Sequence, residues 1–164
     1  ESKRRSRERN RRACIELSAK NDRLTSLTET EIRMPGGHLT IAQLIALLNT
    51  IPMEITFVDV DNINRFFNEG PKDFKRPGMA IDREVFSCHP PKIEATVRRI
   101  IGEFRAGALD EVPIWMDKNG KCMLVRYMAV RDKEGTYLGT LELVQDMGFA
   151  KEHFQPEKRQ EEIW

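Results

Sequence analysis

The clearest periodic segment of the chain lies between Pro90 and Gly107 and has the period of a helix. Apolar side chains recur there at i, i+4, i+7, i+8 and i+11, on one helical face: Ile93, Val97, Ile100, Ile101 and Phe104. Pro90 and Pro91 suit a helix start, because the first N–H groups of a helix have no partner within it. Gly107 stands where a left-handed residue ends a helix. The pattern predicts one long amphipathic helix.

Three strands are predicted after this helix. Runs rich in β-forming residues cover 112–116, 121–131 and 136–147, and the short segments between them each contain a glycine. Glycine-containing turns between such runs are typical of antiparallel hairpins. The middle run is apolar on both alternating faces, which is typical of a central strand or of one covered on both sides. We expect two consecutive hairpins.

A shorter helix and two further strands are predicted upstream. Thr40 and Gln43 form a capping box, and the apolar helical face behind them ends before Pro52. Residues 55–58 read as a strand that returns over 64–68, and residues 69–87 as short helical turns. This order favours an α+β fold, a five-stranded antiparallel sheet with helices packed on one face. The long helix must cross the sheet, so a cavity is expected between them.

Polarity divides the chain into three parts: a basic, partly helical linker (1–37), a folded domain (38–150) and a charged tail (151–164). The linker is expected to form one helix, which Met34-Pro35-Gly36-Gly37 ends. The first 12 residues hold seven basic and two acidic side chains, and the other 152 residues hold 20 basic and 24 acidic ones. The basic run lacks interleaved aromatic residues, so we expect a solvated linker and no nucleic-acid binding. Since the sequence starts without Met, we expect a fragment of a longer, multidomain protein.

Several classes of protein are excluded by what the sequence lacks. No apolar run approaches the ~20 residues of a membrane helix, so we expect no membrane partner. The three cysteines include no CxxC pair, which excludes a four-cysteine zinc site within the chain and favours a reducing, cytoplasmic location. The three histidines stand beside no nucleophile elbow, and there is no glycine-rich phosphate loop. We therefore expect no enzymatic activity.

The element order and several motifs resemble a PAS domain, the small sensor fold of bacterial signalling proteins. The segment 130–139 resembles the last hairpin of that family, and Gln145-Asp146-Met147 resembles its exit motif, although Gly148 replaces the usual Thr. Residues 48–52 and 55–59 fit the entry of the family. More narrowly, Cys88-His89-Pro90-Pro91-Lys92 resembles a subfamily in which the PAS domain follows a hemerythrin-like module. The resemblance covers residues 38–148.

The resemblance implies a sensory module that binds a small ligand or cofactor, or reports redox state, and relays it to other domains of the same chain. The alternative is a ligand-free dimerisation or protein-interaction module. The apolar stripe Leu17, Leu24 and Leu27 could then pack across a homodimer.

The candidate ligand-binding residues of the expected cavity are of two kinds, aromatic and polar. The aromatic residues Phe57, Phe66 and Phe104 could line it or belong to the core. Its candidate polar groups are Arg65, Asn68, His89 and Lys92, and a cationic pair among them would favour an acidic ligand.

The dipeptide Cys88-His89 has two readings. His89 could ligate haem iron as a neutral imidazole, and Cys88 could supply a thiolate beside a helix N-terminus. Alternatively, Ser87 or His89 caps the helix and Cys88 packs as a small hydrophobic residue. The cofactor therefore stays undetermined at this level, with haem as one possibility.

Overall fold

The computed structural model describes residues 28–70, 73–74 and 80–154, and the chain divides into two units between Ile51 and Pro52. In the first unit, β1 (Glu31–Met34) pairs antiparallel with β2 (Gly37–Thr40), and α2 (Ile41–Thr50) follows directly. The predicted capping box is present: the Thr40 hydroxyl accepts from the Gln43 N–H at 3.1 Å, and Gln43 Oε1 accepts from the Thr40 N–H at 2.9 Å. This box fixes the start of α2.

The linker helix predicted up to Met34 is wrong for residues 31–34, which form the strand β1. Pro35 and Gly36 make the two-residue turn of a hairpin, where the sequence pattern predicted only a helix stop. All four residues of β1 are exposed, so no alternation of buried and exposed positions marks the strand in the sequence. The rest of the predicted helix and the stripe Leu17, Leu24 and Leu27 lie outside the described residues.

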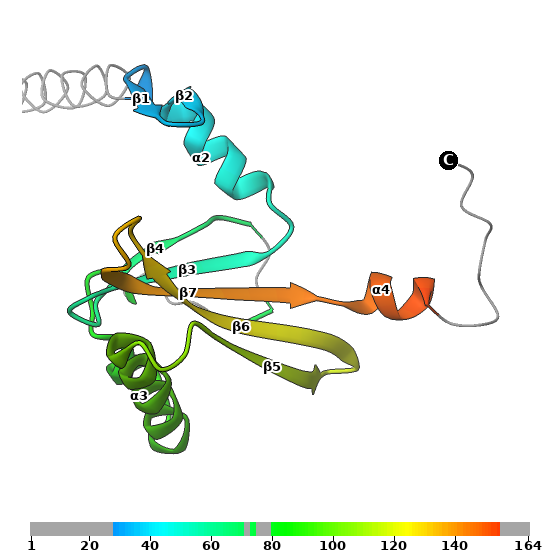
Figure 1. The fold of residues 1–164 in the computed structure, drawn as a ribbon. Coiled ribbons are helices and arrows are strands. Elements are labelled where there is room, and N and C mark those ends of the chain that lie inside the picture. The colour runs from blue at the N-terminus through cyan, green and yellow to red at the C-terminus, as the bar shows by residue number, and fades with distance from the viewer. Residues whose placement is uncertain (1–27, 71–72, 75–79, 155–164) are drawn as a thin grey trace, which may run out of the picture. The chain divides into compact units, whose positions relative to one another are not determined.

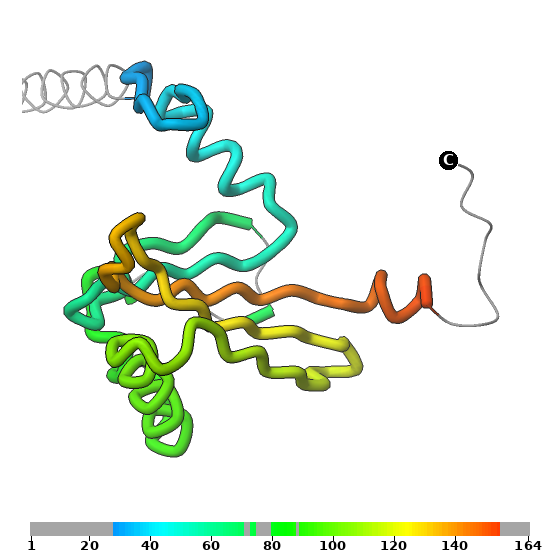
Figure 2. Tube along the Cα trace, in the orientation of Figure 1, coloured from blue at the N-terminus to red at the C-terminus, as the bar shows by residue number. Residues whose placement is uncertain are grey.

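The second unit holds a five-stranded antiparallel sheet in the order β4-β3-β7-β6-β5 (Figure 1). Its strands are β3 (Glu54–Asp59), β4 (Asn64–Phe67), β5 (Glu111–Lys118), β6 (Lys121–Arg131) and β7 (Tyr137–Asp146). The last strand, β7, lies in the middle, between β3 and β6 (Figure 2). The β3–β4 hairpin forms one edge of the sheet and the β5–β6 hairpin forms the other. The predicted α+β class and the five-stranded antiparallel sheet are confirmed.

Turn chemistry sets the strand ends. Asn119 and Gly120 join β5 to β6 with φ of 55° and 80°, the positive values that a two-residue hairpin turn of type I′ requires. Asp132 Oδ1 accepts from the N–H groups of Glu134 and Thr136 in the next turn. In the first turn, Asp117 Oδ1 accepts from the Gly120 N–H at 3.1 Å. These local hydrogen bonds stabilise both predicted turns.

The long helix α3 (Pro91–Ala106) begins and ends as predicted, and Gly107 ends it with a φ of 74°. Its buried face contacts β6 and β7. A short 3-10 helix, η2 (Val85–Cys88), precedes it. The expectation that Ser87 or His89 caps α3 is wrong, because Pro90 is the N-cap residue. The Ser87 hydroxyl donates to the Glu84 carbonyl, and the His89 ring bonds to the Val85 carbonyl.

Two clusters form the core on the face of the sheet that α3 covers. The first joins η2 and α3 to β3: Val58, Val85, Phe86, Val97 and Ile101. The second lies on β6 and β7, with Met123, Val125 and Val144. Within the described ranges, no helix combines the length and apolarity that crossing a membrane requires.

Candidate functional site

A cavity of about 530 Å³ lies between α3 and the sheet, within the second unit. Its volume is in the range of about 300–1,000 Å³ that small-molecule sites occupy. The lining residues are Phe74 and His89, then Lys92, Ile93, Thr96, Val97 and Ile100 of α3, Ile114 and Met116 of β5, Val125 and Tyr127 of β6, and Glu142 and Val144 of β7. The predicted space between the helix and the strands is therefore present.

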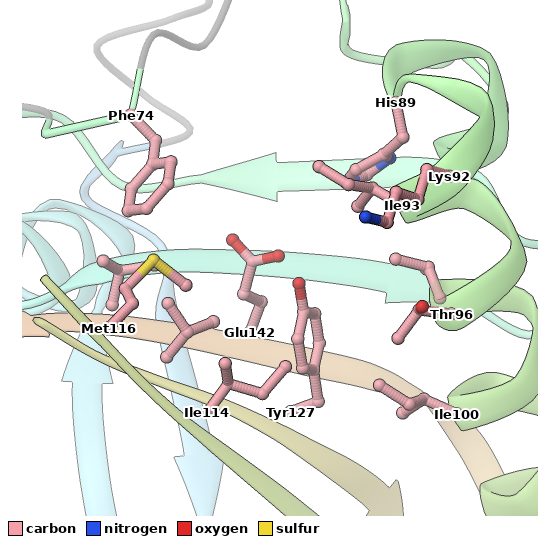
Figure 3. Close-up of a pocket in the computed structure, with 13 residues that line it drawn as sticks. Phe74, His89, Lys92, Ile93, Thr96, Ile100, Ile114, Met116, Tyr127 and Glu142 are labelled. Carbon is pink, nitrogen blue, oxygen red and sulfur yellow. The ribbon is translucent and has the colours of Figure 1, made fainter. Parts of the chain in front are cut away.

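Strand register assembles the sheet wall of this cavity. Val144 of the central strand pairs with Val125, which pairs with Ile114 across the next ladder. One step along the same face, Glu142 pairs with Tyr127. Figure 3 shows the carboxylate and the hydroxyl of this last pair pointing away from the strands into the cavity. The wall is thus apolar with two polar groups at its middle.

Phe74 closes one end of the cavity, and charged side chains fix its backbone. Oε1 of Glu54, a buried residue of β3, accepts hydrogen bonds from the N–H groups of Asp73 and Phe74. Lys118 donates to the Asp73 carbonyl at 2.7 Å, and its ammonium lies 3.2 Å from the centre of the Phe74 ring. Lys121 adds an ion pair to Asp73 at 2.7 Å. Among the residues that the structure describes, the second oxygen of Glu54 is buried and has no hydrogen-bond partner.

The helix side supplies the other polar groups. The Nδ1 atom of His89 lies 2.8 Å from the Val85 carbonyl, and a carbonyl only accepts, so Nδ1 carries the proton. In the neutral ring Nε2 is then the nitrogen with a free lone pair. Lys92 and Thr96 follow along the same side of α3, and both are exposed. The side chain of Cys88 lies outside what the structure describes.

Of the predicted site residues, the structure brings His89 and Lys92 together in the cavity wall. Arg65 lies elsewhere, paired with Asp59 at 2.5 Å and with Asp82 at 2.8 Å. Asn68 is buried and serves the backbone: its Oδ1 accepts from the Ile55 N–H, and its Nδ2 donates to the Met53 carbonyl, both at 2.8 Å. Both side chains are occupied by structural contacts.

The three predicted aromatic residues also lie outside the lining. Phe104 is fully buried in the core, with 0% of its surface exposed. Phe57 and Phe66 pair across the β3–β4 ladder and are half-buried. By strand alternation Phe57 lies on the face of β3 opposite to Val58, and so away from the α3 side. Trp115, on β5, is also outside the lining and is 65% exposed.

The sequence prediction missed Phe74, Thr96, Tyr127 and Glu142 as site residues. Thr96 follows Ile93 by three residues and could have been found from the helical period. Tyr127 lies on β6, which is apolar on both faces, so alternation does not tell which face is inward. Glu142 lies on a face of β7 that also carries Thr140 and Asp146, so the pattern does not mark this face as the inward one. Across the described residues, no three His, Cys, Asp or Glu side chains gather to hold a metal ion.

The fold and the cavity define a class of protein, a small α+β domain with a ligand-sized space between one helix and an antiparallel sheet. A sequence model described as the PAS domain matches residues 44–148, more than half of the chain. The chain therefore belongs to the PAS domain family. No curated protein sequence matches it.

Several solved structures are similar to this chain. The C-terminal domain of a protein from Streptococcus mutans is 37% identical with a TM-score of 0.72, over 76% of this chain and 98% of that one. The PAS domain of a protein from Colwellia psychrerythraea is 15% identical with a TM-score of 0.46, over 65% of this chain and 95% of that one. A sensory box sensor histidine kinase from Vibrio cholerae is 13% identical with a TM-score of 0.44, over 65% and 90%.

Proposed function

We propose that this chain is a sensory PAS module that binds a small ligand between α3 and the sheet and relays its binding to other domains. The observation that carries the proposal is the cavity itself. Its volume of about 530 Å³, its apolar walls and its few polar groups are the ordinary features of a ligand site. The proposal includes no catalytic step.

The proposed relay runs along β7. This strand contributes Glu142 and Val144 to the cavity wall and ends at Asp146, whose Oδ1 accepts from the Gly148 N–H at 2.9 Å. The helix α4 (Gly148–His153) starts there. The residues of β7 that a ligand would contact therefore stand only a few positions before Asp146, where the chain leaves the sheet. Signalling further requires that the ligand bind two conformations with different affinity.

A matched pair of α3 variants tests the ligand site. Thr96 lines the cavity, whereas its neighbour Ala95 is also exposed but does not line it. Native mass spectrometry of the purified protein should detect a non-covalent ligand that disappears on denaturation. Thr96→Phe should lower its occupancy about tenfold or more by filling the space, and Ala95→Phe should retain it. Equal occupancy in both variants, or no ligand and no binding from a metabolite extract, would contradict the proposal.

Haem is a second candidate ligand, favoured by the geometry of His89. A metal-ligating histidine usually donates its other ring N–H to a carbonyl or carboxylate, as Nδ1 does here to Val85. Nε2 would hold the iron, and Lys92 would face the acidic groups of the macrocycle. Titration with hemin should give a Soret band that shifts in His89→Ala if this candidate is correct. An unchanged band in His89→Ala would remove it.

The wider setting is also proposed. The sequence motif before α3 agrees with a hemerythrin-like module in the same chain, and the linker stripe Leu17, Leu24 and Leu27 agrees with a homodimer. The cysteine content agrees with a reducing cytoplasmic location. The ligand-free alternative, an interaction module, predicts a cavity closed by side chains upon assembly and no ligand in the mass spectrum.

A further inference from the structure

The ammonium group of Lys121, the first residue of β6, faces carboxylates from two separate parts of the chain. It lies 2.7 Å from Asp73 Oδ1 and 3.6 Å from Asp146 Oδ2. Asp73 precedes Phe74, which closes one end of the cavity, and Asp146 is the last residue of β7. One cation therefore lies between the end wall of the cavity and the exit from the sheet.

Strand alternation places this cation on the cavity side of the sheet. Lys121 shares its face of β6 with Met123 and Val125, and Asp146 pairs with Met123 across the β6–β7 ladder. Val125 lines the cavity, whereas Lys121 and Asp146 do not. The two charged residues thus continue the cavity face of the sheet past the residues that line it.

The positions of Asp73 and Phe74 depend on each other. The two residues are adjacent, and their N–H groups share one acceptor, Oε1 of Glu54. Figure 3 shows the Phe74 ring at the same end of the cavity as Met116. A ligand that pushes against this ring would therefore also displace the Asp73 carboxylate.

The carboxylate of Asp146 connects Lys121 to the start of α4. Its Oδ1 accepts from the Gly148 N–H at 2.9 Å, while its Oδ2 faces the Lys121 ammonium. Both oxygens belong to one rigid planar group. Rotation of this group toward Lys121 therefore also changes the hydrogen bond to Gly148, the first residue of α4.

The two ion pairs of Lys121 are unequal. The contact with Asp73 is a hydrogen bond, whereas the contact with Asp146 is longer than one. If Asp73 moves away, the ammonium loses its nearer partner and is drawn to Asp146. Resting on the ligand-binding function proposed above, we propose that Lys121 is a positioning residue that couples the cavity to the exit of the sheet. A ligand that displaces Phe74 moves Lys121 from Asp73 to Asp146 and weakens the Gly148 bond.

The coupling can be measured without a ligand. Phe74→Ala removes the ring from the end wall and should release Asp73. Exchange of the Gly148 N–H with solvent, followed by NMR in the full chain, should become about threefold faster, which is within the range of an exposed ion pair. Ile114→Ala, the matched control, removes an apolar side chain from the same lining and should leave this rate nearly unchanged.

The ion pairs are tested by repeating Phe74→Ala in chains that lack the cation. In Lys121→Met, Phe74→Ala should no longer change the Gly148 exchange rate. In Lys133→Met, which removes a lysine that is 90% exposed, the effect should remain about threefold. Asp73→Asn should act like Lys121→Met, and it keeps the inference testable if Lys121→Met does not fold.

An effect of Phe74→Ala that persists in Lys121→Met and in Asp73→Asn would overturn the inference. Equal effects of Phe74→Ala and Ile114→Ala, or no effect of Phe74→Ala, would overturn it as well. None of these results bears on the ligand site itself, which the comparison of Thr96→Phe with Ala95→Phe tests separately.

Discussion

Gly139, on β7, is a position where the backbone leaves no space for a side chain. Its φ is 155°, and a Cβ atom there would lie 2.2 Å from the Val58 carbonyl oxygen and 2.8 Å from the Phe57 ring. The carbonyl belongs to the adjacent strand β3 and cannot move without breaking the ladder. Glycine at this position is therefore required by the close approach of two central strands.

We predict opposite effects for two glycine-to-alanine substitutions. Gly139→Ala should lower the free energy of unfolding by about 3 kcal/mol or more, through strain and overlap. Gly102→Ala, in the middle of α3 with nothing within 4 Å of the added Cβ, should raise it by about 1 kcal/mol. Urea denaturation measures both. A Gly139→Ala variant as stable as the unmodified chain would contradict the contact between β3 and β7.

Asn68 and Arg65 show why single residues of the site were hard to predict. Both are polar, stand near a strand end and were reasonable candidates for a ligand site. The partners that occupy them are remote in the sequence: the backbone at Met53 and Ile55, and the carboxylate of Asp82. Only the three-dimensional structure shows that these hydrogen-bonding groups are already used.

At the scale of elements, local chemistry predicted most of the second unit. The helix α3 and both C-terminal hairpins follow from apolar period, prolines and turn residues that act within a few positions of each other. The hairpin β1–β2 was missed because its strands bury little surface. The cavity could be expected from the element order, but its lining depends on which face of β6 and β7 meets α3.

The β3–β4 turn is an element whose stability depends on pH. Burial raises the pKa of Asp59, but the Arg65 guanidinium and the N–H groups of Ile63 and Asp61 outweigh it, and the net pKa lies below its ordinary value of 3.8. A carboxyl group with a lowered pKa in the folded state stabilises it above the unfolded pKa and loses this contribution as the pH falls through the folded pKa.

We therefore predict that Asp59→Asn makes the free energy of unfolding less dependent on pH below about 4. Arg65→Gln should have the same effect, since it removes the cation that lowers the pKa. Urea denaturation at pH values between about 2 and 6 measures both dependences. An unchanged acid dependence in Arg65→Gln would show that the ion pair does not set this behaviour.

At the scale of the whole molecule, the second unit carries its own sheet, core and cavity. Both core clusters and all of the cavity lining belong to residues after Pro52. We predict that a fragment of residues 52–164 folds cooperatively and keeps the ligand affinity of the longer chain within about threefold. Calorimetry measures the unfolding transition of both chains, and ligand titration measures their affinities. A fragment without a cooperative transition would show that residues before Pro52 are needed for folding.

The central position of β7 has a consequence for protein synthesis. Glu54 of β3 pairs with Val144, 90 residues later, so the middle of the sheet closes only after nearly all of it has been translated. At about 5–20 residues per second, β3 waits about 5 to 18 seconds for its partner on the ribosome. During that interval one edge of β3 is open to strands of other nascent chains. Ribosome stalling before Tyr137 would prolong this exposure and favour aggregation of the truncated chain.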